Sequence, residues 1–195
     1  MKRAVSPLVL LSVFVVVVGC TTTSAGEPRP QETSTGTSDT TGSPGSGDLP
    51  SRPREIRLDD VDPCKLVPEA DRSEYYIDEP GEAGADDEDN AECTWVGTEV
   101  GYFGYTLDVS EGIETRLDGS YTVVGDIADP IRGFGVVTYA LPDDEGACFA
   151  AVDVADGQQL IATVGINKSD LDNVPPLCEY AHQFASSAME TLVES

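Results

Sequence analysis

Positive charge is scarce in this sequence. Its 195 residues include 11 Lys and Arg against 36 Asp and Glu, which makes the formal net charge −25. Proteins bind nucleic acids largely through Lys and Arg, which displace counterions from the phosphates, and adsorption to anionic lipid head groups needs the same residues. We therefore expect no nucleic-acid partner. The acidity itself is typical of a soluble, self-repelling surface, with a cationic partner or a metal as the alternative.

Histidine is nearly absent, because His182 is the only one. Ser-His-Asp catalysis, Cys-His catalysis and His-based zinc binding would all have to use it. It lies in a predicted C-terminal helix together with Ser186 and Ser187, where the fixed helical spacing prevents a triad. We interpret His182 as a surface or half-buried side chain. We predict no catalytic residue and no cofactor, and we expect that the protein is not an enzyme.

Motifs for phosphate binding and for nucleophilic catalysis are also missing. The sequence has no G-x-S-x-G, no P-loop and no complete G-x-G-x-x-G. Residues 133–135 form a lone G-x-G, which favours a bulge or tight bend in a strand over a phosphate cradle. Trp95, the single tryptophan, follows Cys93 by two residues. We interpret it as a core residue packed on a disulfide, with an exposed sugar- or partner-binding Trp as the alternative.

The densest acidic stretch does not have the spacing of a known cation site. Residues 78–92 hold eight acids and no base. Counted from Asp86, the sixth position is Ala91 and the twelfth is Gly97, whereas an EF-hand loop needs Gly and Glu there. We interpret the stretch as a solvated loop, with a weak, irregular cation site as the alternative, and predict no metal site.

The N-terminus has the pattern of an export signal. Lys2 and Arg3 precede the apolar run 8–18, which is too short for a permanent membrane helix. The run ends in residues 17–20, Val-Val-Gly-Cys, which resemble the lipobox of bacterial lipoproteins. The resemblance implies that residues 1–19 are removed and that the thiol of Cys20 carries diacylglycerol, which would anchor the protein in the lipid bilayer at the extracytoplasmic face of the cell membrane. A secreted protein with a free Cys20 and a retained membrane helix are the alternatives.

The next segment predicts a tether. Of the 34 residues 21–54, 24 are Thr, Ser, Gly or Pro, and none is aromatic. Such a composition cannot bury enough apolar surface to offset the entropy of ordering. We therefore divide the chain into a signal peptide (1–19), the lipidated Cys20 with a disordered tether (20–54), and a single folded domain (55–195).

Alternating apolar residues predict strands in this domain. The expected strands are 93–96, 101–109, 121–124, 134–141, 148–154 and 160–166. Asp156-Gly157, between the last two strands, predicts a tight hairpin, because Gly accepts the positive φ that such a turn requires.

Helices are expected at both ends of the domain. Asp62-Pro63-Cys64 predicts a short helix capped by Asp62, and Pro68 opens a second turn. After Pro175 and Pro176, apolar residues recur at three- and four-residue steps and predict a C-terminal helix. The fold class is therefore α+β: a mostly antiparallel sheet with short N-terminal helices and a C-terminal helix packed on one face.

The order of several short motifs resembles an actinobacterial lipoprotein family called domain of unknown function 3558. The motifs are Asp62-Pro63-Cys64, Cys93-Thr94-Trp95, Gly133-Phe134-Gly135, a strand opened by Cys148, and Cys178-Glu179-Tyr180-Ala181. The resemblance implies an envelope lipoprotein with two disulfides inside the domain and no assigned catalytic residues. Of the three pairings that four cysteines allow, we expect Cys64–Cys93 and Cys148–Cys178.

These features favour a non-enzymatic module that binds another protein of the cell envelope. The tether and the missing catalytic set motivate this hypothesis. The alternative is a small-molecule or lipid carrier, which needs a pocket between the sheet and the C-terminal helix. A hydrolase that uses unrecognised acids is the third hypothesis.

Overall fold

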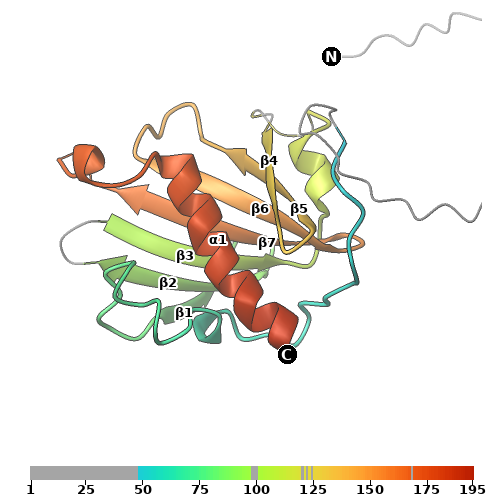
Figure 1. Cartoon of the computed structure of the whole chain (residues 1–195), viewed down its shortest axis with the longest axis horizontal. Coiled ribbons are helices and arrows are strands. Elements are labelled where there is room, and N and C mark those ends of the chain that lie inside the picture. The colour runs from blue at the N-terminus through green and yellow to red at the C-terminus, as the bar shows by residue number, and fades with distance from the viewer. Residues whose placement is uncertain (1–47, 98–100, 120, 122, 124, 168) are drawn as a thin grey trace, which may run out of the picture. The chain divides into compact units, whose positions relative to one another are not determined.

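A single antiparallel sheet forms the centre of the domain. The computed structural model describes residues 48–97, 101–119, 121, 123, 125–167 and 169–195. Within them, seven strands lie in the order β1-β2-β3-β7-β6-β5-β4, and every neighbouring pair is antiparallel. Figure 1 shows β1 and β4 at opposite edges of the sheet, with helix α1 lying across one face. The predicted α+β class is confirmed.

The sheet consists of two meanders placed side by side. The strands are β1 (Glu82–Ala85), β2 (Ala91–Gly97), β3 (Gly101–Asp108), β4 (Asp126–Ile131), β5 (Phe134–Tyr139), β6 (Ala147–Ala155) and β7 (Gln158–Ile166). One meander is β1 to β3, the other is β4 to β7, and β3 pairs with β7 at the junction. The chain therefore crosses from the centre of the sheet to its far edge between β3 and β4. The 3-10 helix η2 (Ile113–Arg116) lies in this crossing.

Helix α1 (Leu177–Glu194) closes one face of the sheet. It begins directly after Pro176, as predicted, and packs on β5, β6 and β7. Its predicted apolar stripe is buried: Tyr180, Ala181, Phe184, Ala185, Ala188, Met189 and Leu192. Phe184 stacks on Tyr105 of β3 with ring centroids 4.3 Å apart, and the Tyr105 hydroxyl donates to the Phe184 carbonyl at 2.7 Å. No helix in the described residues is both long enough and apolar enough to cross a membrane.

Tight turns join neighbouring strands. The predicted hairpin between β6 and β7 is confirmed, with Gly157 at φ +70°. A second two-residue turn, which the sequence reading missed, joins β4 to β5 through Arg132 and Gly133, both at positive φ (51° and 88°). Positive φ at both central residues is the requirement of a type I′ turn. The lone G-x-G therefore begins at a tight bend, as interpreted, although the hairpin that this bend closes was not predicted.

The expected N-terminal helices are reduced to one short turn. Asp62 caps the 3-10 helix η1 (Pro63–Lys65) with Pro63 at its start, but no α-helix follows. Residues 69–76 form turns. Pro68 lacks the backbone N–H that would extend η1 into a longer helix, and Pro80 and Gly81 follow the turns of residues 69–76. A further 3-10 helix, η3 (Leu171–Asn173), precedes α1.

Three strand predictions need correction: the loop expected at 78–92, the strand expected at 121–124, and β4 (Asp126–Ile131), which was not predicted. The acidic stretch 78–92 is not a continuous loop, because it contains β1 and the start of β2. All four residues of β1 are exposed, so no apolar alternation marks the strand in the sequence. In contrast, Tyr121 and Val123 of the expected strand 121–124 lie in bends, and the other two residues are outside the described part.

The domain begins before residue 55. Leu49 and Pro50 lie over Gly135 of β5, and Arg52 pairs with Asp153 at 2.6 Å and with Asp156. The last seven residues of the expected tether, 48–54, therefore pack on the domain. The composition of this segment does not predict the contact, because it is made by a partly buried ion pair and by Leu49 and Pro50 rather than by an apolar run. The signal peptide, Cys20 and residues 21–47 lie outside the described residues.

Candidate binding face of the sheet

Two disulfides hold the ends of the domain to the sheet. Cys64 is bonded to Cys93 of β2, and Cys148 of β6 is bonded to Cys178 at the start of α1. These are the predicted pairs. Each closes a loop of about 30 residues, for which the chain-entropy model gives roughly 3.5 kcal/mol of stabilisation.

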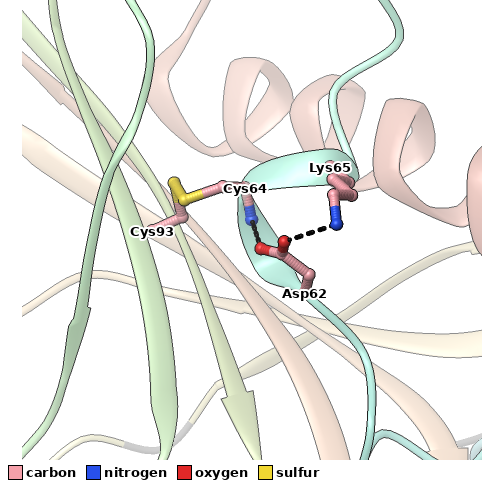
Figure 2. The surroundings of a disulfide bond; sticks show 4 residues. All are labelled: Asp62, Cys64, Lys65 and Cys93. Carbon is pink, nitrogen blue, oxygen red and sulfur yellow. Dashed lines mark hydrogen bonds and ion pairs between the residues drawn. A yellow bond between two sulfur atoms is a disulfide. The ribbon is translucent and has the colours of Figure 1, made fainter.

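The first disulfide lies beside a small polar cluster (Figure 2). The carboxylate of Asp62 accepts from the backbone N–H of Cys64 at 3.0 Å and lies 3.0 Å from the Lys65 ammonium. The hydrogen bond from Lys65, followed by the one from Cys64, lowers the pKa of Asp62. This cluster shapes the turn that presents Cys64 to β2. Its role is structural.

The face of the sheet opposite α1 is less covered. Successive side chains of a strand point to opposite faces of the sheet, so those that do not point towards α1 lie on the other face, which we call the open face. Strand register aligns them in rows across the sheet. One row runs Thr94, Gly104, Thr163, Phe149 and Tyr139, and the next runs Glu92, Thr106, Ile161, Ala151 and Val137.

Part of the open face is filled by the chain itself. Ile113, Val137, Ala151 and Ile161 form a small second core, which is capped by Leu49 and Leu117. The cover comes from the β3–β4 crossing and from residues 48–50. It extends over β5, β6 and the end of β7, and leaves the middle of β2, β3 and β7 uncovered.

The uncovered area forms a groove of about 330 Å³. We call it the open-face groove. It is lined by Asp86, Glu92, Thr94, Tyr102, Gly104, Tyr105, Thr106, Tyr139, Phe149, Ile161 and Thr163. Its lining combines aromatic rings, threonine hydroxyls and carboxylates, and its volume lies within the range of ligand pockets.

A buried polar network borders the groove. Asp108 accepts from Gln159 Nε2 at 2.9 Å and lies 3.5 Å from a guanidinium nitrogen of Arg116. The Arg116 guanidinium lies over the rings of Tyr121 and Tyr139, at 4.3 and 5.4 Å from their centroids. Gln159 is fully buried, and Asp108 is 4% exposed. Sequence reading passed over these residues, because their partners come from separate elements.

His182 and Trp95 both contact neighbouring elements of the fold. The His182 ring is half-buried on α1, with Nε2 2.7 Å from the Asp129 carbonyl of β4. Trp95 is 2% exposed, packs edge-on against Tyr105 and Phe184, and lies directly beside Gly81. The interpretation of Trp95 as a core residue is confirmed.

The acidic loop uses its own carboxylate to form a turn. Asp86 accepts from the backbone N–H groups of Glu88 and Asn90 at 2.9 and 2.8 Å, and from the Asn90 amide at 3.0 Å. Within the described residues, no group of three or more His, Cys, Asp or Glu side chains is placed to hold a metal ion.

The open-face groove was not predicted from the sequence. The sequence feature that could have indicated it is the polar and small face of β3, formed by Tyr102, Gly104, Thr106 and Asp108.

Comparison with known proteins identifies a family but no described relative. No curated protein and no solved structure matches the chain. A family match covers residues 15–191, which is most of the chain. The chain belongs to the family described as "Protein of unknown function (DUF3558)".

Proposed function

We propose that this protein is a lipoprotein anchored through Cys20 at the extracytoplasmic face of the cell membrane, and that its domain binds another envelope protein without turning over a substrate. The open-face groove carries the second part of this proposal. It is the concave surface of the sheet that combines exposed aromatic and polar side chains, while the opposite face is closed by α1.

The address rests on the residues at the N-terminus and on the cysteines. A charged start, a short apolar run and Val-Val-Gly-Cys at residues 17–20 together match a lipoprotein signal. The four remaining cysteines pair in two disulfides. Disulfides persist in oxidising surroundings, which is consistent with a domain outside the cytoplasm.

A binding role is supported by the position of the reactive side chains. His182 is engaged with a backbone carbonyl of β4, belongs to α1 and does not line the groove. The groove itself offers hydroxyls, carboxylates and rings, which recognise a partner by hydrogen bonds, charge and stacking. This set of groups suits an interface.

The carrier hypothesis receives less support. It needs a pocket between α1 and the sheet, but the described side chains fill that interface. Tyr75, Phe103, Tyr105 and Phe184 form stacked and edge-to-face ring pairs there, with centroids 4.3 to 5.7 Å apart. Protein interiors packed in this way leave no room for a lipid chain.

Fractionation of Cys20→Ser cells tests the anchor. The wild-type protein should partition into detergent with the membrane, because two acyl chains on one Cys give stable anchoring. The variant should appear in the medium or remain unprocessed. As the control, Ser24→Ala changes a neighbouring residue and should leave the membrane fraction unchanged. An unaltered membrane fraction for Cys20→Ser would contradict lipidation.

Affinity capture from cross-linked envelopes tests binding. The anchored wild type should retain a defined protein that Cys20→Ser retains less, since anchoring raises the local concentration of membrane-bound partners. A domain that carries a bound lipid or glycan and retains no protein would replace this proposal with the carrier.

A further inference from the structure

We propose that the open-face groove receives a lysine or arginine side chain of the protein partner. This inference rests on the proposed binding function and names the chemistry of the partner at the groove. Three features of the groove support it: a floor without bulky side chains, an aromatic wall, and a carboxylate at one end.

The floor of the groove is lowered by a glycine. Gly104 of β3 lies between Thr94 of β2 and Thr163 of β7 in one row of the open face. A Cβ built on Gly104 would meet only ordinary contacts, the nearest being the Cys93 carbonyl at 3.5 Å. An alanine would therefore fit here. The glycine is not required by the packing of the sheet, and its effect is to leave space above the strand.

The wall of the groove is aromatic. The Tyr102 ring lies directly over Gly165 of β7, where a Cβ would come within 2.1 Å of it, and the side chain remains 38% exposed. Across β7 and β6, the rings of Phe149 and Tyr139 are stacked 5.0 Å apart at 9°. The Phe149 and Tyr139 rings cover each other, whereas the exposed side of the Tyr102 ring can hold the methylene stem of a long side chain and attract its cationic end.

The carboxylate of Glu92 supplies charge at the end of the groove. Thr106 donates its hydroxyl to Oε1 of Glu92 at 2.9 Å, which orients the group. Among the described residues, no donor lies within hydrogen-bonding distance of Oε2 of Glu92. The neighbouring Asp86 is different, because its two oxygens accept hydrogen bonds inside the β1–β2 loop. Glu92 is therefore the residue that faces a ligand.

The chain already contains one example of the proposed pairing. Arg116 lies over Tyr121 and Tyr139 while its guanidinium approaches Asp108. Tyr139, whose ring lies under the Arg116 guanidinium, also lines the open-face groove. The strong excess of acids in the chain adds a long-range attraction for a basic partner. Charge complementarity therefore selects a cationic side chain over an acidic or apolar one.

NMR titration of the full-length chain in detergent micelles tests the assignment. The probes are blocked tripeptides Gly-Lys-Gly, Gly-norleucine-Gly and Gly-Glu-Gly, with free 1,4-diaminobutane as a small amine. We expect saturable shifts at groove residues with the lysine peptide, and about tenfold weaker binding of the norleucine peptide, which has the stem without the charge. Higher salt should weaken the lysine peptide only.

Variants locate the binding. Glu92→Gln should weaken the lysine peptide about three- to fivefold, the usual value of an exposed ion pair, and leave the norleucine peptide unchanged. Gly104→Ala should weaken both peptides several-fold, because it raises the floor. Glu69→Gln, an exposed carboxylate outside the groove, is the matched control and should change neither.

Three results of the peptide titration would overturn the inference: equal binding of the lysine and norleucine peptides, shifts that lie outside the groove, or diaminobutane binding at least as tightly as the lysine peptide. The last result would assign the groove to a small amine. These probes do not use the cellular partner, so their failure would leave the proposed protein-binding function untouched, and capture of the partner tests that function separately. A partner captured equally by wild type and Glu92→Gln would contradict this inference alone.

Discussion

At the scale of single residues, glycines mark the places where the chain has no room for a side chain. Gly81 lies against the Cys64–Cys93 disulfide and the Trp95 ring: a Cβ there would be 2.3 Å from the Cys93 sulfur and 2.6 Å from Trp95 Nε1. Both groups are buried, and the disulfide restrains one of them. The sequence shows Gly81 only as one more residue of an acidic, turn-rich stretch.

Gly81→Ala should therefore destabilise the domain. We expect a loss of about 2–3 kcal/mol in the free energy of unfolding, the usual cost of overpacking a well-packed site. Gly84→Ala is the control, since a Cβ at Gly84 meets nothing within 4 Å, and it should change stability by less than about 0.5 kcal/mol. Denaturant unfolding followed by Trp95 fluorescence measures both. Equal stability of the two variants would show that the contact at Gly81 can relax.

A second residue-scale prediction concerns alkaline pH. Burial raises the pKa of Tyr180 to about 12, and its hydroxyl donates to the Glu74 carbonyl at 3.1 Å. In the unfolded chain a tyrosine titrates near pH 10. The folded state thus holds this proton more tightly, so the contribution of Tyr180 is complete below pH 10 and is lost as pH rises towards 12.

Unfolding free energies of wild type and Tyr180→Phe, compared between neutral pH and pH 12, check this prediction. The variant should lose less stability over that range than the wild type, because it has no phenol to ionise. Absorbance titration should show one high-pKa tyrosine fewer. Parallel stability curves would place Tyr180 outside the alkaline transition.

At the scale of elements, alternation and helical periodicity predicted the strands and the helix that bury one regular apolar face. β2, β3, β5, β6, β7 and α1 were predicted close to their observed places, because each buries a regular apolar stripe. β1 and β4 were missed because β1 buries none of its side chains and β4 fully buries only Ile131. The Arg132-Gly133 turn was missed because Arg is not a residue that signals positive φ. The candidate groove was missed for a related reason: its residues come from β2, β3, β5, β6 and β7, and only register places them together.

The segment 48–54 gives the element-scale prediction. Arg52 pairs with Asp153, whose pKa is raised by burial, and with Asp156. Arg52→Ala should cost about 1–2 kcal/mol of unfolding free energy, since it leaves a poorly solvated carboxylate without its partner. Arg57→Ala removes an exposed pair with Asp59 and should leave stability nearly unchanged. Similar losses in both variants would mean that 48–54 is not an integral part of the domain.

At the scale of the whole molecule, one face of the sheet is closed and the other is partly open. α1 and the first disulfide-linked turn cover one side, whereas the β3–β4 crossing covers only part of the other. The uncovered part faces away from the helix and carries the groove. In the proposed function, the domain is held near the membrane and meets its partner through this uncovered surface.

Photo-cross-linking in intact cells tests this central claim most directly. The photoreactive amino acid p-benzoylphenylalanine replaces Val96, which is 71% exposed on the open face, or Glu179, which is exposed on α1. We predict a cross-link to a specific protein from position 96, absent from position 179, and reduced in cells that also carry Cys20→Ser. Equal cross-linking from both positions, or a cross-link from α1 alone, would contradict a binding role for the open face.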